Sequence, residues 1–220
     1  MGGPNAVGGR GGSAAAPFQM KTYVATKNLG KLEEMKSVFA GTELELDTFP
    51  LYSEAPEDAD NYAGNAESKA RMLHQQLREA GVHGAVLSDD SGLEVAALGG
   101  RPGVLSARYA GKEASWQTRR EKLLEELAHV PAEQRGARFC CAMMLILETG
   151  EDFTGYGEVD GVITAQEHGR FGFGYDPVFF YPPADMTFAQ MRETEKDRVS
   201  HRRRAGEALL ASYREWLRKR

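Results

Sequence analysis

Residues 84–95 read GAVLSDDSGLEV, an apolar run followed by two adjacent carboxylates. The run GAVLS has the length and composition of a buried strand. Residues 65–80, before it, carry an amphipathic helical pattern that ends at Gly81, and residues 115–128, after it, carry another. A strand enclosed by helices is typical of α/β proteins, so this segment predicts the fold class.

The alternation of short apolar runs and amphipathic segments continues on both sides. Residues 149–152, TGED, form a turn signal between two long apolar runs, which predicts a β-hairpin. We expect residues 89–111 to be a glycine-rich loop with one short helix, and the sequence has no internal repeat. The other predicted elements are strands at 22–26, 44–49, 137–148, 152–159 and 176–181, an exposed loop at 52–60, and helices at 29–39 and 203–218.

The composition is that of a soluble globular protein, with 41% hydrophobic and 27% charged residues. The net charge of -5 argues against a protein that holds nucleic acid by bulk electrostatics, since phosphate neutralisation needs a basic face. No stretch approaches the roughly 18 consecutive apolar residues of a membrane span. Cys140 and Cys141 are neighbours in one predicted strand and are not expected to form a disulfide, which indicates a reducing cytoplasm.

The N-terminal end of the sequence differs from the rest. Residues 1–19 are rich in glycine and alanine and lack apolar periodicity, which predicts a disordered extension or tag. They also lack the pattern of a secretory signal. We therefore expect one ordinary or two-lobed domain over residues 20–220.

Two polar segments next to predicted strands indicate binding of an anion and a cation. TKNLGK, residues 26–31, opens a helix, so its backbone N–H groups and Lys31 can face an anion, although a plain strand-to-helix turn gives the same pattern. In DDSGLEV successive side chains alternate, so one carboxylate is expected to face a cleft, where it can hold a hard cation or orient a water. Glu57 can supply a second oxygen ligand. The alternative is that Asp89 or Asp90 only caps a turn.

Two further segments suit a nucleotide. FGFGYDP, residues 171–177, combines glycines that let the backbone approach a ligand with aromatic rings that can stack on a base, and Asp176 can accept from a ring N–H. Residues 195–205, EKDRVSHRRRA, place cations at the start of a helix, where the dipole disfavours them. Such a cluster indicates an anionic ligand or, alternatively, a solvated face. Its donors are Lys196, His201, Arg202, Arg203 and Arg204.

Together and in this order, these segments resemble the inosine triphosphate pyrophosphatase family, the RdgB-type enzymes that cleave non-standard purine nucleoside triphosphates. The resemblance covers the chain from Met20 almost to its end and rests on TKNLGK, NAESKA (65–70), DDSGLEV, PGVLSARYAG (102–111), FGFGYDP and SHR (200–202). It implies a two-lobed α/β fold, with a central elongated mixed sheet flanked by helices and an active-site cleft between the lobes. It also implies a homodimer, while the charge and the absence of a long apolar stretch predict no nucleic-acid or membrane partner.

The resemblance further implies roles for individual residues. Asp90 would be the catalytic carboxylate and would hold Mg²⁺ together with Glu57. Lys27 stands where the family often has glycine, which makes the phosphate loop less permissive or adds a cation to it. The residues expected to bind the nucleotide are Thr26, Lys27, Asn28, Lys31, Ser91, Phe173, Gly174, Tyr175, Asp176, Lys196, His201 and Arg202.

These assignments lead to a hypothesis for the reaction. A water positioned or deprotonated by Asp90 attacks the α-phosphorus, while Lys31 and Lys196 neutralise charge on the departing pyrophosphate. Hypoxanthine and xanthine offer O6 as an acceptor and N1–H as a donor, so His201 or Arg202 would donate to O6 and Asp176 would accept from N1–H. Adenine has a donor at position 6 and an acceptor at N1, the reverse of this pattern. Guanine shares O6 and N1–H, so its rejection requires protein atoms that leave no room or no hydrogen-bond partner for its 2-amino group.

Three other functions stay open at this point. A Maf-like pyrophosphatase has a related fold, but FGFGYDP and SHR favour the purine-type family. A non-catalytic nucleotide sensor would keep the base pocket and lose the carboxylates, whereas Asp89 and Asp90 are present. An RNA-binding module that uses the basic residues of 196–220 is disfavoured by the acidic total.

Overall fold

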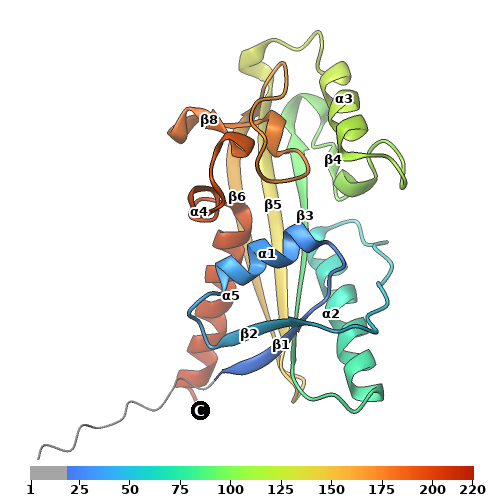
Figure 1. The fold of residues 1–220 in the computed structure, drawn as a ribbon, viewed down its shortest axis with the longest axis vertical. Helices are drawn as coiled ribbons and strands as arrows, with labels where there is room; N and C mark the ends of the chain where they lie inside the picture. Colours follow the sequence, from blue (N-terminus) through green and yellow to red (C-terminus); the bar gives the residue numbers. More distant parts are fainter. Residues whose placement is uncertain (1–18) are drawn as a thin grey trace, which may run out of the picture.

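The computed structural model describes residues 19–220 as a mixed sheet flanked by helices (Figure 1). The strands are β1 (Met20–Val24), β2 (Leu44–Thr48), β3 (Ala85–Val95), β4 (Pro102–Gly103), β5 (Gly136–Ile146), β6 (Asp152–Ile163), β7 (Phe179–Tyr181) and β8 (Met186–Thr187). The helices are α1 (Leu29–Val38), α2 (Tyr62–Glu79), α3 (Trp116–Glu126), α4 (Glu193–Lys196) and α5 (His201–Arg218). The strand order is β2-β1-β3-β5-β6-β7-β8, with β4 beside β3. β1 is parallel to β2 and β3, and the remaining pairs are antiparallel.

Three long strands, β3, β5 and β6, run along the molecule and join two lobes (Figure 1). The first lobe holds β1, β2, α1, α2 and α5, and the second holds α3, β4, β7 and β8. Each lobe has its own hydrophobic core, which contains Leu87 and Met143 in the first lobe and Leu93 and Phe139 in the second. The predicted two-lobed mixed α/β fold is confirmed.

Helices cover both faces of the sheet in the first lobe. On one face Met143 of β5 packs in a cluster with Leu209 of α5, and on the other face its neighbour Met144 packs in a cluster with Leu73 of α2. Successive strand residues point to opposite faces, so this alternation places α5 and α2 on opposite sides. Side chains of β3 near the middle of the molecule therefore reach one helix or the other.

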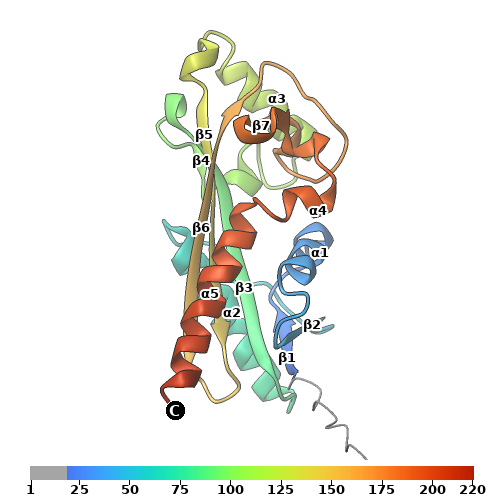
Figure 2. The same cartoon turned by 90° about the vertical axis from the view of Figure 1, so that its left-hand side faces the viewer.

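Two glycines of β6 let α5 lie directly on the strand, and α5 runs alongside β6 (Figure 2). A Cβ atom on Gly157 would lie 2.2 Å from the carbonyl oxygen of His201, and one on Gly155 would lie 2.1 Å from that of Ala205. Only glycine permits such a close approach of backbone to backbone. The first turn of α5 is thereby held against the middle of the sheet.

The structure corrects the expected loop at residues 89–111. β3 continues through the DDSG motif to Val95, because residues 86–95 pair in continuous antiparallel register with β5. Asp90 pairs with Ala142, and Leu93 pairs with Phe139. The two aspartates thus lie in the middle of a strand that both lobes share, and neither caps a turn.

Other expected elements are present with different bounds. The strand expected at 176–181 was half wrong: Asp176–Val178 form a 3₁₀ turn, and only Phe179–Tyr181 join the sheet. Pro177 has no N–H to donate to a ladder, which accounts for the late start. α2 begins at residue 62 and α5 at residue 201, where Asn61 and Ser200 cap them. The loop at 52–60 is only partly exposed, since Tyr52 and Ala55 are buried.

Some expectations concern the ends and the surface of the chain. The extension expected at residues 1–19 lies, apart from Gln19, outside the described residues. Among residues 19–220 no helix combines the length and the apolar character needed to cross a membrane. Cys140 and Cys141 are free and buried, as expected for neighbours in one strand.

Candidate active site

The two adjacent carboxylates of β3 point to opposite faces of the sheet, as the alternation of strand side chains requires. Asp89 faces α1 and α5, where it accepts hydrogen bonds from Lys31 Nζ at 3.2 Å and Arg202 Nε at 3.1 Å. Asp90 faces α2, where its Oδ1 accepts from Lys69 Nζ at 3.0 Å. Both aspartates are buried. They therefore occupy two separate environments within one strand.

Lys69 joins Asp90 to Glu57, which lies in the loop before α2. Its Nζ is 3.0 Å from Asp90 Oδ1 and 2.5 Å from Glu57 Oε1, so the two carboxylates contact the same ammonium group. Asn65, one turn earlier on α2, donates to Asp90 Oδ2 at 3.0 Å. Burial alone would lower the pKa of Lys69, but Asp90, Asp89 and Glu57 outweigh it and raise that pKa, so the ammonium stays charged.

Arg202, in the first turn of α5, is fixed by two carboxylates and a hydroxyl. Its Nη1 donates to Glu34 Oε2 at 2.8 Å, its Nε to Asp89 Oδ2 at 3.1 Å and its Nη2 to Ser91 Oγ at 2.7 Å. Glu34 also lies 3.7 Å from Lys196 Nζ. Burial would lower the pKa of Arg202, but Glu34 and Asp89 raise it. Glu34 therefore contacts two buried cations, and one of them, Arg202, also contacts Asp89 of β3.

Phe173 lies in a tight loop whose glycines adopt backbone conformations that other residues rarely take. Gly172 and Gly174 have φ angles of 70° and 64°. The Phe173 ring is held against cations, with Lys196 Nζ 4.8 Å and Arg202 Cζ 5.3 Å from its centroid. The FGFGYDP motif thus places a flat apolar ring beside two fixed positive charges.

Asp176 holds this loop in place through hydrogen bonds to its backbone and to Lys196. Its Oδ2 accepts from the Phe173 backbone N at 2.8 Å and from Lys196 Nζ at 2.7 Å. Burial raises the pKa of Asp176, although Lys196 opposes the effect. One carboxylate oxygen is therefore already committed to the loop and to Lys196.

Three more rings, those of Tyr175, His201 and Phe139, belong to the aromatic part of the site. Tyr175 is buried, and its hydroxyl donates to the Ser106 carbonyl oxygen at 3.0 Å. His201 stacks on Phe139, with ring centroids 4.8 Å apart and an interplanar angle of 11°. These contacts bring residues of β5, α5 and the loop after β6 to one place.

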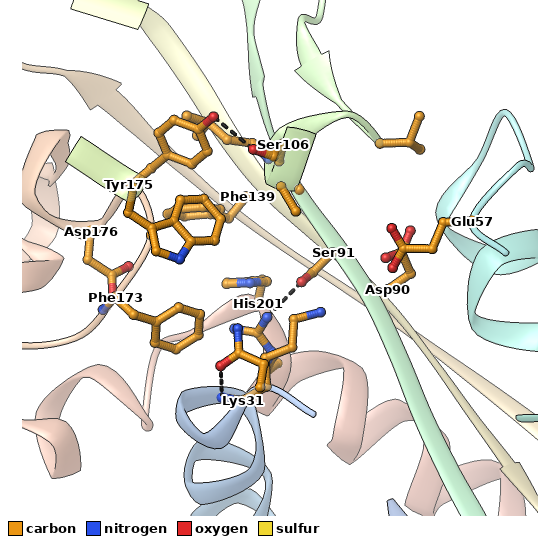
Figure 3. A pocket seen from close by; sticks show the side chains of 18 of the residues that line it. Lys31, Glu57, Asp90, Ser91, Ser106, Phe139, Phe173, Tyr175, Asp176 and His201 are labelled. Carbon is orange, nitrogen blue, oxygen red and sulfur yellow. Dashed lines mark hydrogen bonds between the residues drawn. The ribbon is translucent and has the colours of Figure 1, made fainter. Parts of the chain in front are cut away.

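The carboxylates and the aromatic rings line one cavity (Figure 3). Glu57 and Asp90 lie at one end and Phe173 and Tyr175 at the other, with Ser91 between them. A single elongated ligand can therefore contact both ends. The other lining residues are Asn28, Lys31, Gly92, Leu93, Val104, Ser106, Ala107, Trp116, Phe139, Gly174, Asp176, Lys196, His201 and Arg202.

Thr26 and Lys27 do not line this cavity but an adjoining hollow, which shares Asn28, Lys31 and Glu57 with it. Asn28 mainly shapes the turn, because its side-chain oxygen caps α1 by accepting from Lys31 N at 3.2 Å. Cations border the hollow and suit a polyphosphate. They are Lys27, Lys31, Lys69, Arg108 and Lys112, and the acidic side chains among them are Glu54, Glu57, Asp58 and Asp89.

Comparison with known proteins identifies the family. The family model described as the Ham1 family matches residues 22–212, which is most of the chain. The chain belongs to the Ham1 family.

Individual relatives agree with this assignment over almost the full chain. A dITP/XTP pyrophosphatase of Exiguobacterium sibiricum is 41% identical over 201 residues, which cover 90% of this chain and 99% of the relative. A dITP/XTP pyrophosphatase of Geobacter sulfurreducens is 43% identical over 200 residues, 89% of this chain and 97% of the relative. The structure of a HAM1 protein from Coxiella burnetii has a TM-score of 0.77 at 34% identity and covers 90% of this chain and 100% of that one. The family resemblance seen in the motifs is confirmed.

Sequence reasoning missed several residues of this Ham1-family site. Lys69 and Asn65 are four residues apart in NAESKA, so helical spacing could have placed both on the face of α2 that meets β3. Glu34 is buried with Met35 and Val38 on one side of α1, where a carboxylate requires a charged partner. Both patterns were present in the sequence, but neither shows which residue the side chains would contact.

The Glu34 carboxylate offers a test of this buried charge network. Glu34→Gln keeps the size and an acceptor but removes the charge that pairs with Arg202 and Lys196, so we expect it to lower the free energy of unfolding by about 1–3 kcal/mol. Urea unfolding measures this value. The control is Glu33→Gln, since the Glu33 side chain is 61% exposed and its loss should cost less than about 0.5 kcal/mol. Equal effects of the two variants would contradict the network.

His201 is neutral in this Ham1-family protein, which gives a pH dependence. Burial, with Arg202 and Lys196 nearby, lowers the pKa of His201 well below its usual value. The unfolded chain takes up a proton near the ordinary histidine pKa of about 6.5 and the folded chain does not, so stability falls as pH drops below that value. We expect His201 to contribute a loss of up to about 1.4 kcal/mol per pH unit.

Urea unfolding between pH 7.5 and 5 measures this effect in wild type and in His201→Gln. The variant should have a shallower decline of stability with falling pH. His83→Gln is the matched control, because it makes the same chemical change at a side chain that is 85% exposed. A wild-type slope in His201→Gln would show that His201 does not cause the decline.

Proposed function

We propose that the chain hydrolyses non-standard purine nucleoside triphosphates, namely ITP, dITP and XTP, to the monophosphate and pyrophosphate, and so removes them from the nucleotide pool. The observation that carries the proposal is the single cavity in which Asp90 and Glu57 lie at one end and Phe173 and Tyr175 at the other. The names of the curated relatives, dITP/XTP pyrophosphatases, support the same activity.

The proposed orientation of the nucleotide follows from the chemistry of the two ends. The purine base lies among the aromatic rings, where it can stack. The α-phosphate, which is nearest to the nucleoside, then lies beside Asp90 and Glu57. The β- and γ-phosphates extend into the adjoining hollow, where Lys27, Lys31 and Lys69 provide positive charge.

The cation in this proposal is Mg²⁺, held by Asp90 and Glu57. The two carboxylates fit a cation, because Lys69 Nζ contacts an oxygen of each. Across residues 19–220 no group of three or more histidine, cysteine, aspartate or glutamate side chains is placed to hold a metal. Mg²⁺ suits such a two-carboxylate site, since it commonly completes its shell with waters and substrate phosphates. When bound, it would offset the negative charge of the phosphate oxygens.

The residues of the chain then have the following roles. Asp90 orients the attacking water and accepts its proton. Lys31 and Lys69 neutralise charge that develops on the departing pyrophosphate. Lys196, assigned to this task from the sequence, lies instead beside Phe173 and is paired with Asp176, so we place it at the base.

Base recognition follows from the buried donors at the aromatic end. Arg202 is a donor only, and Lys196 stays charged because Asp176 and Glu34 raise its pKa against the effect of burial. Either can donate to O6 of hypoxanthine or xanthine. His201 is neutral and can donate from one ring nitrogen, and its buried Nδ1 has no partner among the described residues. Asp176 Oδ1 can accept from N1–H.

Product analysis tests the function and the metal together. We expect ITP, dITP and XTP to yield pyrophosphate and monophosphate in equal amounts with Mg²⁺, and EDTA to abolish the reaction until Mg²⁺ is restored. GTP and ATP are the comparison substrates. Orthophosphate and a diphosphate as products, or full activity in EDTA, would contradict the proposal.

The remaining parts of the proposal rest on the family resemblance for the dimer and on the composition for the location and the absent partners. We propose a homodimer located in the cytoplasm, with no nucleic-acid or membrane partner. The net charge of -5 supports the absence of bulk nucleic-acid binding. The molar mass in solution, measured by light scattering, tests the dimer.

A further inference from the structure

Trp116 borders the nucleotide cavity from an element that none of the motifs includes. It is the first residue of α3, directly after the capping residue Ser115. Its side chain lines the cavity together with Phe173 and Tyr175, and the residue is half-buried. Trp116 packs against the hydrophobic core of the second lobe and also lines the cavity, so part of its ring is available to a ligand.

Contacts with neighbouring groups hold the Trp116 ring in place. It lies edge-on to the Tyr175 ring, with centroids 5.6 Å apart and an interplanar angle of 78°. The Arg119 guanidinium lies 4.8 Å from the ring centroid. A Cβ atom on Gly174 would lie 3.8 Å from the indole, at van der Waals distance, so the loop passes directly beside the ring. Arg120 Nη1 donates to the Gly174 carbonyl oxygen at 2.9 Å, which ties α3 to this loop.

Phe173 reaches the same cavity from a different side. Its ring lies against Gly30 of α1, 3.1 Å from where a Cβ would stand, and beside Lys196 and Arg202. Trp116 instead packs against Tyr175 and Arg119 of the second lobe. Two aromatic rings, each fixed by its own partners, thus border one cavity, and a planar base is the part of a nucleotide that fits between such rings.

We infer that Trp116 is a second stacking residue for the purine base, in addition to Phe173. This inference rests on the proposed function. Stacking does not depend on the groups at the edge of the base, so Trp116 contributes affinity and does not choose between bases. Edge recognition is left to Arg202, Lys196 and His201. Trp116 therefore acts on every base-bearing ligand alike and on no ligand without a base.

Tryptophan fluorescence reads this contact directly. The chain has two tryptophans, and Trp216 lies near the end of α5, packed on Phe153 and Tyr213. In a Trp216→Phe protein Trp116 is the only tryptophan, and selective excitation of tryptophan reports on it alone. We expect IMP to change its emission in a saturable manner and ribose 5-phosphate, which has the same sugar phosphate without a base, to leave it unchanged.

Kinetics of substituted proteins provide the second readout. Trp116→Ala should raise KM for ITP about tenfold to a hundredfold with little change in kcat, and should raise KM for any slower base-bearing substrate by the same factor. Inhibition by inorganic tripolyphosphate should stay at the wild-type value. Trp116→Phe should restore most of the affinity, and Trp216→Phe is the control that should keep the wild-type KM.

The outcomes separate this inference from the proposed function. If ITP is hydrolysed but Trp116→Ala keeps the wild-type KM, or if IMP and ribose 5-phosphate affect Trp116 emission equally, the inference is overturned and the function stands. If ITP is not hydrolysed, the proposed function fails, and the fluorescence of Trp116 with IMP still decides whether the ring contacts a purine.

Discussion

Asp90→Asn is expected to lower kcat/KM for ITP by about 10²–10⁴-fold, the range for loss of a group that takes a proton in the transition state. Asp90 is buried, and its two oxygens already face Asn65 and Lys69, so its position depends little on the substrate. Asparagine has nearly the same shape, but it cannot accept the proton of a water and binds a hard cation weakly. Steady-state pyrophosphate release measures the effect.

Two controls keep this result interpretable. Asp160→Asn makes the same chemical change on β6, where the side chain is 80% exposed and paired with Arg138, and it should retain wild-type turnover. The thermal midpoint of Asp90→Asn reports whether the variant is folded, since its amide would present a donor to Lys69. A folded Asp90→Asn protein with wild-type turnover would remove Asp90 from the mechanism.

ITP is expected to have a kcat/KM about 10⁴ times that of ATP, as found where a site is built to pair with a substrate group that the competitor lacks. The donors at the aromatic end are buried, and both Arg202 and Lys196 remain charged. The 6-amino group of adenine would point its hydrogens at these donors, so neither side would gain a hydrogen bond and the desolvation of the amino group would not be offset.

The comparison needs only the wild-type protein and matched concentrations of the two substrates. Deoxyadenosine and deoxyinosine triphosphates, which share a sugar, should give a ratio of the same size. Equal kcat/KM for ITP and ATP would refute the assignment of these donors to O6.

Most helices and strands could be predicted from the sequence, because the hydrophobic periodicity of each element is a local pattern. Strand runs such as TYVAT and the apolar face with Met35 and Val38 depend only on neighbours in the chain, and both elements are present, although the strand spans Met20–Val24 and not 22–26. The error at residues 89–111 has a different origin. Charge and glycine in DDSG suggest a loop, whereas pairing with β5, a segment about fifty residues away in the sequence, keeps these residues extended.

The candidate site could be predicted where a motif carries its own chemistry. Asp90, Phe173 and Arg202 were found in this way, and they line one cavity. Glu34 and Trp116 belong to no motif, because their roles arise only when α1 meets α5 and when α3 meets the loop before β7. A pattern within one helix can indicate that a carboxylate needs a charged partner, but it cannot show which distant element supplies that partner.

The central claim is that one nucleotide lies with its base among the aromatic rings and its α-phosphate beside Asp90. Hydrolysis of ITP in ¹⁸O-labelled water tests it most directly, because the attacked phosphorus keeps the oxygen of the water. The account predicts that the label appears in IMP and that pyrophosphate is unlabelled. Label in pyrophosphate would mean attack at the β-phosphorus and would contradict the account.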